Sequence, residues 1–342
     1  MKVSVIGASG YIGGELLRLL LQHPNIEVIA ATSNQYKGDY IFNVHPNLRG
    51  YTSLKFSGHD EILSSDVIFL CLPHGIAMSH IDSYSQKAKY IIDLSSDFRI
   101  KDINQYYKWY KKKHEQPTWL PKFVSGIPEF YRESIEKANY IAIPGCMANA
   151  SLMALMPLEK ENVLGNHRII IDAKTGSSGS GATPNLSNLH AQRSGTVRLF
   201  KSMGHRHEAE LKQEINKDVQ LTVTSVELVR GIQISAHVTF NREIQEKELW
   251  SIYRKYYNDE PFIRIIKQKK GLYRYPEPKI LSGTNYCDIG FSLDQETGKH
   301  AVIISAIDNL VKGGAGNAVQ VLNIVAGWDE TLGLNFIGLH PI

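Results

Sequence analysis

The chain has 342 residues, of which 43% are hydrophobic and 21% charged, and its formal net charge is +4. This length exceeds what one hydrophobic core usually contains, so we expect two domains. The composition argues against a disordered chain, and the mild charge gives no indication of nucleic-acid binding. No stretch approaches the roughly 18 consecutive apolar residues of a membrane span, and the N-terminus lacks a signal-peptide pattern, so we expect a cytoplasmic protein without membrane contact.

A glycine-rich turn follows the first predicted strand. Lys2 to Ile6 is mostly apolar and leads into GASGYIGG and then a helical pattern through Leu21. A strand, a glycine turn and a helix in this order bind a dinucleotide, because the backbone approaches the pyrophosphate closely and the helix N-terminus faces its charge. The cofactor residues predicted at this turn are Gly7, Ser9, Gly10, Tyr11, Ile12 and Gly13.

The second predicted strand, Glu27 to Ala31, bears on the choice of cofactor. An NAD-binding protein usually has an acidic residue at the end of this strand, where it binds the ribose 2′-hydroxyl. Here Thr32, Ser33 and Asn34 follow instead, with Lys37 nearby. Hydroxyl and amide groups tolerate a 2′-phosphate, so we predict NADP, bound in part by Ser33 and Asn34.

Two further apolar strands, Val67 to Leu72 and Tyr90 to Leu94, both end in polar residues. Functional groups at the carboxyl ends of apolar strands are typical of a doubly wound parallel sheet of the Rossmann type. His74 follows the first of these strands. It is either a cofactor-side residue or a loop histidine with local hydrogen bonds only.

The segment Ile141 to Pro157 reads IAIPGCMANASLMALMP. A Pro-Gly-Cys turn precedes an apolar run with helical spacing, which places the Cys146 sulfur at a helix N-terminus. The N–H groups and the helix dipole there favour the thiolate, which is the form that attacks carbonyls. A buried, inert cysteine is the alternative. The three cysteines, Cys71, Cys146 and Cys287, are not spaced as in a zinc site or a disulfide framework, so we expect no metal.

The second half of the chain is predicted to form an α+β domain with a mixed sheet. Its first strand, Ile169 to Ala173, leads into KTGSSGSGA, which is either a flexible linker or a loop of the substrate domain. Alternating apolar and polar residues then indicate half-buried strands. The predicted strands are 219–228, 231–240, 262–267, 286–293 and 301–308. The predicted helices are one opened by 204–210 and running to about 217, and those at 246–257 and 312–328.

The helix near residue 207 carries a second candidate catalytic group. His207 and Glu210 lie three residues apart and share one helix face, so the carboxylate can orient the imidazole. His205 is the alternative acid or base. The fold is predicted to be α/β. We assign residues 1–145, completed by the C-terminal helix segment 312–342, to NADP binding, and residues 146–311 to catalysis, substrate binding and oligomerisation.

The chain contains, in this order, GASGYIGGELLRLL, CLPHG, IIDLSSDFR, GIPEF, PGC, AKTGSSGSG, GHRH and KGGAGNAVQ. Together these motifs, which span nearly the whole chain, resemble the N-acetyl-gamma-glutamyl-phosphate reductase family, relatives of aspartate-semialdehyde dehydrogenase. The resemblance implies an NADPH-dependent reductase that converts an acyl phosphate to an aldehyde through an enzyme thioester. It also implies that Asn317 contacts the nicotinamide side of NADP.

At two positions that follow the PGC motif, the chain departs from the pattern of that family. It generally has an aromatic residue and, two positions on, a threonine, where this chain has Met147 and Asn149. In these positions the chain is more similar to a sister branch in archaeal and Thermus-type lysine and arginine biosynthesis. That branch reduces an aminoadipyl or glutamyl phosphate attached to a small acidic amino-group carrier protein. An N-acetylated glutamyl phosphate is the alternative substrate.

The resemblance also implies roles for single residues. The Cys146 thiolate attacks the acyl phosphate, and His207 supports the oxyanion of the thiohemiacetal. Ser95 and Arg99, or else Arg206, hold the leaving phosphate. On charge alone, we expect the carrier's acidic surface to meet a basic cluster and Arg193 or Arg198; the alternative for the cluster is a solvated helix face. This cluster comprises Lys108, Lys111, Lys112, Lys113 and His114.

Other classes of protein remain possible from the sequence. A nucleotide-sensing binding protein would have the glycine turn but no need for Cys146 with a His–Glu helix. Aspartate-semialdehyde dehydrogenase shares the chemical scheme, but its free amino-acid substrate requires a carboxylate clamp, and the sequence does not reveal one. A mixed sheet also supports a homo-oligomer, either a dimer or a tetramer.

Overall fold

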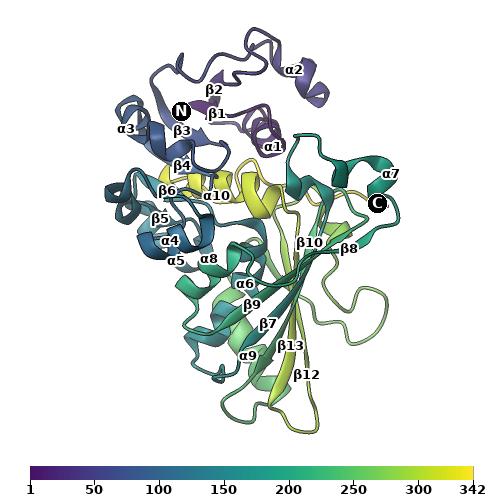
Figure 1. Ribbon diagram of the computed structural model, residues 1–342. Coiled ribbons are helices and arrows are strands. Elements are labelled where there is room, and N and C mark those ends of the chain that lie inside the picture. Colours follow the sequence, from purple (N-terminus) through teal and green to yellow (C-terminus); the bar gives the residue numbers. More distant parts are fainter. Residues whose placement is uncertain (342) are drawn as a thin grey trace. The chain divides into compact units, whose positions relative to one another are not determined.

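The structure is a computed structural model that describes residues 1–341 and divides into two compact units (Figure 1). The first unit contains residues 1–144 and 314–335, and the second contains residues 145–313 together with the residues after Asn335. The sequence assigned the whole of 312–342 to the first domain. The chain end differs because Phe336 lies against the backbone of Gly283 in the second unit. Ile342 lies outside the described residues.

The first unit contains a six-stranded sheet in which every pair of neighbouring strands is parallel. The strand order β2-β1-β3-β4-β6-β5 runs outward in both directions from the first strand, as in a doubly wound sheet. This confirms the predicted Rossmann-type fold. The strands are β1 (Lys2–Ile6), β2 (Glu27–Ala31), β3 (Ser65–Leu70), β4 (Ala88–Asp93), β5 (Val124–Ser125) and β6 (Tyr140–Ala142).

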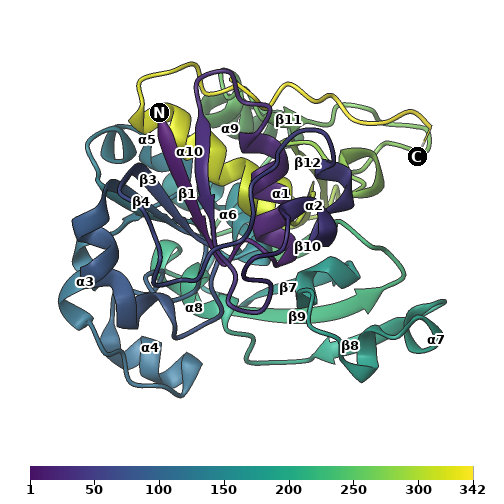
Figure 2. The same ribbon diagram turned by 90° about the horizontal axis from the view of Figure 1, so that it is seen from above.

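The helices of the first unit connect and cover these strands (Figure 2). The last of them, α10, comes from the C-terminal part of the chain and packs on α1 and α5, so the first unit is completed by a distant segment. Asp102 caps α4 by accepting the N–H groups of Asn104 and Gln105. The helices are α1 (Tyr11–Leu20), α2 (Ile41–Val44), α3 (Ala77–Lys87), α4 (Ile103–Tyr110), α5 (Pro128–Glu136) and α10 (Gly316–Val325).

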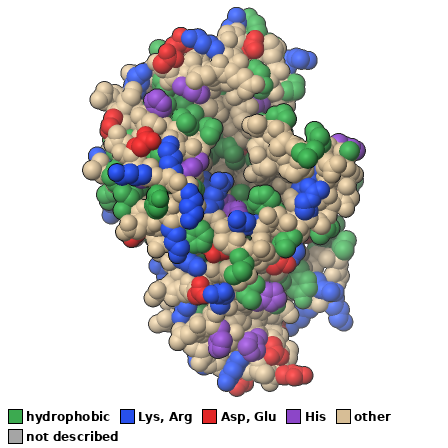
Figure 3. Space-filling model, viewed as in Figure 1, with side chains coloured by type: hydrophobic (Ala, Val, Ile, Leu, Met, Phe, Trp, Pro, Cys, Tyr) green, Lys and Arg blue, Asp and Glu red, His purple; other side chains and the backbone are tan. Residues whose placement is uncertain are grey.

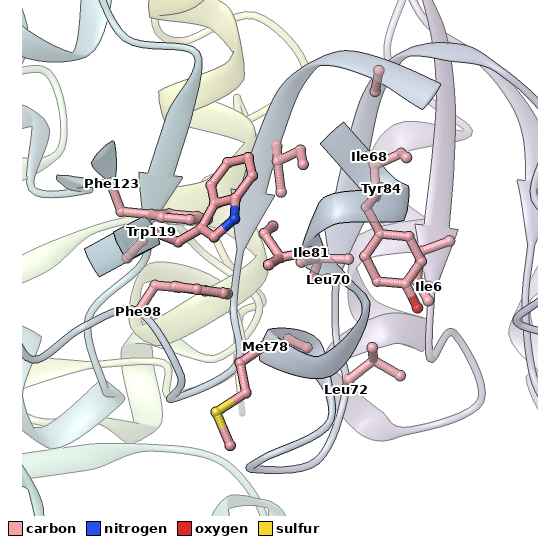
Figure 4. Packing of buried hydrophobic residues seen from close by; sticks show 14 of the residues in the cluster. Ile6, Ile68, Leu70, Leu72, Met78, Ile81, Tyr84, Phe98, Trp119 and Phe123 are labelled. Carbon is pink, nitrogen blue, oxygen red and sulfur yellow. The ribbon is translucent and has the colours of Figure 1, made fainter. Parts of the chain in front are cut away.

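One hydrophobic cluster joins the sheet of the first unit to α3 and to the segment before β5 (Figure 4). Leu70 of β3 and Ile81 of α3 are completely buried in it. The rings of Phe98 and Phe123 stack with centroids 4.1 Å apart. Phe98 lies in the loop after β4, so this packing holds the polar loop at the carboxyl end of that strand.

The second unit contains a seven-stranded mixed sheet with the order β11-β12-β13-β10-β7-β9-β8. The pairs β7–β9 and β11–β12 are parallel, and the others are antiparallel. This confirms the predicted mixed sheet, with β8 as an unpredicted edge strand. The strands are β7 (Ile169–Thr175), β8 (Val197–Lys201), β9 (Val219–Val226), β10 (Ile232–Thr239), β11 (Ile263–Ile265), β12 (Cys287–Leu293) and β13 (His300–Ile307).

Helix α6 (Cys146–Lys160) is the central helix of the second unit. It packs against β10, β12 and β13 and against α8 (His207–Glu214) and α9 (Glu246–Tyr257). Every residue from Met147 to Leu158 is buried, as expected of a helix that is apolar on all sides. A short helix, α7 (His190–Arg193), precedes β8. Among the residues described, no helix is both long and apolar enough to cross a membrane.

The Gly-Ser stretch after β7 is an ordered loop of the second unit. It forms a 3-10 turn over Ser177–Ser180. The buried Ser178 exchanges hydrogen bonds with Asn309, with Asn309 Nδ2 2.9 Å from the Ser178 Oγ. Of the two interpretations of this stretch, the structure supports the domain loop.

Candidate active site

Cys146 is the first residue of α6, and Gly145 is its extended N-cap with φ −63° and ψ 145°. The helix therefore begins where the sequence predicts. The Gly145 carbonyl accepts the Asn149 N–H at 2.7 Å, which closes the first turn. Cys146 is half-buried. At this position the N–H groups of the first turn and the helix dipole favour a thiolate.

Two glycines allow other segments to lie directly against this turn. A Cβ atom on Gly145 would overlap the His207 imidazole. A Cβ atom on Gly313 would lie 2.8 Å from the Cys146 Cβ, which is closer than side chains approach. His207 and the Gly313 backbone are therefore in contact with the cysteine turn, and side chains at these two positions would force them away.

Glu210 connects this turn to α8. Its Oε2 accepts the Gly145 N–H at 2.7 Å, and its Oε1 lies 3.9 Å from His207 Nε2. The two side chains are buried, with exposed fractions of 6% for His207 and 5% for Glu210. One carboxylate thus holds the residue before Cys146 and faces the imidazole. The structure brings together Cys146, His207 and Glu210 as the sequence suggested.

His205 is held as a hydrogen-bond acceptor. Its Nδ1 accepts the His207 N–H at 3.2 Å, and the two rings meet edge to face with centroids 4.6 Å apart. Burial, and then the charges of Arg206 and Lys201, lower the pKa of His205 to about 4. At neutral pH His205 is therefore an uncharged imidazole that orients the backbone of His207.

Glu208 is a buried carboxylate that sequence reasoning missed. Its Oε1 accepts the N–H groups of Gly204 at 3.0 Å, His205 at 3.3 Å and Leu221 at 3.1 Å. It thereby ties the histidine turn to β9. The available signal was an acidic residue in the first turn of α8, where a side chain can reach back to N–H groups before the helix.

The glycine turn of the first unit has the close backbone contacts that a pyrophosphate site requires. Gly7 has φ +80°, and a Cβ atom there would lie 2.7 Å from the Cys71 carbonyl oxygen. A Cβ atom on Gly13 would lie 2.6 Å from the Ala8 Cα. α1 begins at Tyr11, and its N-cap Gly10 has no side-chain cap. Ile12 follows Tyr11 in the first turn of α1. These residues fit a dinucleotide phosphate at the helix N-terminus.

The residues after β2 lie beside this turn. The Ser33 Oγ donates a hydrogen bond to the Ser9 Oγ at 2.9 Å, which brings two predicted cofactor residues together. Asn34 is exposed, and its Oδ1 accepts the His59 N–H at 3.0 Å. Lys37 pairs with Glu61 at 2.5 Å. The loop therefore presents hydroxyl and amide groups directly after the strand.

The residues predicted for the nicotinamide and for the leaving phosphate differ in burial and in hydrogen bonding. Asn317, at the start of α10, is fully buried and donates to the Gly126 carbonyl at 2.7 Å. Arg99 donates to the carbonyls of Ile143 at 2.8 Å and Leu94 at 3.0 Å. The buried Ser95 accepts the Asp97 N–H at 3.2 Å. Arg206 is exposed and directly precedes His207 in the second unit. Arg99 and Ser95 thus contact the loop after β4, and Arg206 belongs to the histidine turn.

A buried polar cluster lies at the carboxyl ends of β3 and β4. Asp97 accepts the N–H groups of Gly75 at 2.7 Å and Met78 at 3.1 Å, and lies 3.0 Å from His74 Nδ1. Burial, and then the charge of Asp97, raise the pKa of Asp93 to about 7. His74 Nδ1 also lies 2.8 Å from the Ser96 Oγ, so this ring belongs to the polar cluster, and a role beside the cofactor stays a prediction. No group of three or more His, Cys, Asp or Glu among the described residues could hold a metal ion.

Comparison with known proteins first defines the class. Residues 2–138 match the family described as semialdehyde dehydrogenase, NAD binding domain, and residues 146–309 match its dimerisation domain. The fold resembles aspartate semialdehyde dehydrogenase II of Vibrio cholerae complexed with ASA, with TM-score 0.72 and 17% identity, covering 95% of this chain and 98% of that one. The enzyme from Candida albicans with NADP has TM-score 0.68, 14% identity, and coverage of 95% and 98%. The protein is an oxidoreductase of this class, with a nicotinamide-nucleotide domain.

More similar relatives define the family. A Thermomicrobium roseum protein named putative [LysW]-L-2-aminoadipate 6-phosphate reductase is 46% identical, covering 100% of this chain and 99% of its own. The Deinococcus radiodurans [LysW]-L-2-aminoadipate 6-phosphate reductase is 46% identical, with 99% and 98% covered. A Nitrosopumilus maritimus protein named putative [LysW]-L-2-aminoadipate/[LysW]-L-glutamate phosphate reductase is 43% identical, covering 100% of both chains. The chain belongs to the [LysW]-L-2-aminoadipate/[LysW]-L-glutamate phosphate reductase family, as its motifs indicated.

Proposed function

We propose that this protein reduces an aminoadipyl or glutamyl phosphate, attached to a small amino-group carrier protein, to the semialdehyde, with NADPH as reductant. The names of the relatives support the substrate. The observation that supports the chemistry is the placement of Cys146 at the start of α6, with His207 packed on Gly145 and Glu210 bonded to the Gly145 N–H.

The reaction follows from these residues. The Cys146 thiolate adds to the acyl carbonyl, the carbon–oxygen bond to phosphate breaks, and inorganic phosphate leaves with the bonding electrons. A thioester to Cys146 remains. When bound, NADPH supplies the hydride that reduces this thioester. His207 donates a proton to the oxyanion of the thiohemiacetal and takes it back as the aldehyde departs and the thiolate returns.

We assign the acid and base role to His207. Its imidazole lies directly against Gly145, whereas His205 Nδ1 is occupied in accepting the His207 N–H. With its pKa lowered to about 4, His205 is uncharged at neutral pH and cannot serve as an imidazolium acid. His205 is therefore a positioning residue for His207.

We infer that NADP is preferred over NAD. Ser9 and Ser33 form a hydroxyl pair at the end of β2, and no carboxylate occupies positions 32–34 to repel a 2′-phosphate. Asn317 is assigned to the nicotinamide side by resemblance alone. Its amide donates to Gly126, so it also holds the entrance of α10 within the first unit.

Arg206 is the residue we favour for the leaving phosphate. It is exposed and adjacent to His207, so its guanidinium has freedom to meet a charged ligand. Arg99 already donates to two backbone carbonyls, which makes it a structural anchor of the loop that contains Ser95. Ser95 and Arg99 are weaker candidates for this reason.

The carrier is assigned to the lysine-rich end of α4. Lys108, Lys111 and Lys113 are exposed there, and Figure 3 shows several Lys and Arg side chains in the region of α4. Lys112 is half-buried and lies 3.2 Å from the Gly75 carbonyl. His114 is buried and contacts the Asp97 carbonyl, so it is not part of the exposed basic surface that the sequence predicted. An acidic carrier fits the three exposed lysines.

The two arginines predicted to meet the carrier, Arg193 and Arg198, also differ in exposure. Arg198 is exposed on β8, whereas Arg193 is half-buried and donates to the Ser225 hydroxyl and the carbonyls of Thr175 and Val226. Arg198 is thus available to a partner, and Arg193 stabilises the sheet edge. The strand β8 is exposed along its whole length, with Val197 at 80% and Phe200 at 68% exposure. A homo-oligomer, as either a dimer or a tetramer, would cover this apolar edge.

Turnover measurements test the substrate. The purified protein is incubated with NADPH and either carrier-linked aminoadipyl phosphate, carrier-linked glutamyl phosphate or N-acetylglutamyl phosphate, and NADPH oxidation is followed. We expect kcat/KM for a carrier-linked substrate to exceed that for the acetylated one by at least about 100-fold. A preference for the N-acetylated substrate would move the protein to arginine biosynthesis through the alternative reaction.

A further inference from the structure

Asn149 is a buried amide near the start of the mostly apolar helix α6. It lies three residues after Cys146, one helical turn along, and is 1% exposed. Its Nδ2 donates to the Lys312 carbonyl at 2.8 Å. Its Oδ1 is buried and accepts no hydrogen bond from residues 1–341. A half-satisfied buried amide lowers stability relative to an apolar side chain, so its single bond needs an explanation other than stability.

The bond from Asn149 ends next to the nucleophile. Lys312 directly precedes Gly313, whose Cα faces Cys146 so closely that a side chain on Gly313 would meet the Cys146 Cβ at 2.8 Å. The Gly313 N–H donates to the Asp308 carbonyl at 2.9 Å. The peptide group between Lys312 and Gly313 is thus held on both sides: its carbonyl accepts from Asn149, and its N–H donates to the Asp308 carbonyl.

The Asp308 side chain fixes the remainder of this turn. Its carboxylate accepts the N–H groups of Leu310 at 2.7 Å and Val311 at 3.2 Å, and that of Gly283 at 2.7 Å. The turn is therefore rigid on the strand side. On the side of α6, the hydrogen bond from the Asn149 amide to the Lys312 carbonyl holds this turn against the first turn of the helix.

We propose that Asn149 is a positioning residue for Cys146: by holding the Lys312 carbonyl, it keeps the Gly313 backbone against the cysteine and limits the side-chain orientations of the nucleophile. This inference deepens the proposed function, because it rests on Cys146 as the nucleophile. It also gives the departure at position 149 a physical meaning. A threonine hydroxyl is shorter than an amide, and in a helix it bonds the carbonyl four residues earlier, so it would not reach Lys312.

The matched control is Ser305. Its Oγ donates to the Ala150 carbonyl at 2.6 Å, so it is a second buried polar contact to α6, from β13. It bonds the helix one residue beyond Asn149 but does not hold the turn at Gly313. Ser305→Ala therefore removes a hydrogen bond to the same helix without releasing the wall beside Cys146.

The test measures acylation of Cys146 with p-nitrophenyl acetate, which needs neither NADPH nor the carrier. The thiolate attacks the acetyl carbonyl, the ester bond breaks, and p-nitrophenolate leaves in a burst. Cys146→Ser provides the blank. We expect Asn149→Ala and Asn149→Thr to slow the burst about tenfold, the loss typical of one buried hydrogen bond, and Ser305→Ala to change it by less than about twofold.

Alkylation by iodoacetamide across a pH series completes the test. Because the helix N-terminus rather than Asn149 favours the thiolate, we expect the midpoint of the alkylation profile to be the same in all variants. An unchanged burst in Asn149→Ala, or an equal loss in Ser305→Ala, would overturn the positioning role. Substrate preference is a separate readout. A wild-type burst without reduction of the carrier-linked substrate would count against the proposed function and leave the role of Asn149 standing.

Discussion

Two helices of this protein begin after a glycine, and their surroundings are opposite. Gly10 before α1 and Gly145 before α6 are both extended N-caps without a side-chain cap. A Cβ atom on Gly10 would have no described atom within 4 Å, whereas one on Gly145 would overlap His207. The first helix start is open to an incoming anion. The second is enclosed by protein groups, and in the proposed mechanism it stabilises the Cys146 thiolate. On that proposal the helix dipole serves binding in one unit and reactivity in the other.

The largest expected effect separates Cys146 from the other cysteines. Cys146→Ser should lower kcat by about 10⁴-fold or more, because the serine hydroxyl at a helix start is not a thiolate. Cys71→Ser is the control: burial, and then Asp93, raise the pKa of the Cys71 thiol, so this cysteine is not a nucleophile at neutral pH. NADPH oxidation with the acyl phosphate measures both variants. Activity near wild type in Cys146→Ser would remove the thioester scheme.

The glycine turn of α1 offers the next test. Gly13→Ala places a Cβ atom 2.6 Å from the Ala8 Cα, so the turn must move, while Gly10→Ala meets only open space. We expect Gly13→Ala to weaken NADPH binding by about 10- to 100-fold, in line with a loss of about 1–3 kcal/mol. Gly10→Ala should affect the fold little. Fluorescence titration with NADPH compares Gly13→Ala with the wild-type protein, and an unchanged affinity would show that the close approach at Gly13 is unimportant.

Cofactor choice provides an effect of comparable size. Ser33→Asp places a carboxylate at the end of β2, where it can bind a ribose 2′-hydroxyl and repel a 2′-phosphate. We expect the ratio of kcat/KM for NADPH over NADH to fall by about 10- to 100-fold, or about 1.4–2.7 kcal/mol. Ser33→Ala is the matched control, since it removes the bond to Ser9 without adding charge. The same ratio in all three proteins would contradict the proposed role of this loop.

The last prediction concerns the pH dependence of stability in the second unit. The pKa of His205 is lowered from 6.5 to about 4, so below pH 6.5 the unfolded chain takes up a proton that the folded chain does not. Stability from this group is complete above pH 6.5 and is lost as the pH falls towards 4, by up to about 3 kcal/mol. Urea unfolding at pH 7.5 and pH 5 measures this. In His205→Asn, which retains an acceptor but does not titrate, the drop should be smaller, and an identical drop would exclude His205 as its source.

Local sequence patterns were sufficient for some features and not for others. The strand, glycine turn and helix at residues 2–21 lie in one short segment, so their geometry follows from neighbouring residues. His114 shows the limit: it stands in a run of lysines but is buried, and its Nε2 lies 3.0 Å from the carbonyl of Asp97, 17 positions away. Glu208 and Asn309 were also missed. Each bonds backbone groups distant in sequence, and no periodicity records such a partner.

The sequence by itself determined the class of chemistry: a dinucleotide turn, a cysteine at a helix start and a histidine three residues before a glutamate are all local arrangements. Only the tertiary structure decided which groups face the nucleophile. Gly145 and Gly313 are 168 positions apart in the chain, yet one admits His207 and the other lies on Cys146. Such contacts arise because α6 packs against α8 and β13, which are distant from it in the chain. The Asn149 amide and the Glu210 carboxylate therefore bond to backbone groups 163 and 65 positions away, and no local pattern in the sequence records these partners.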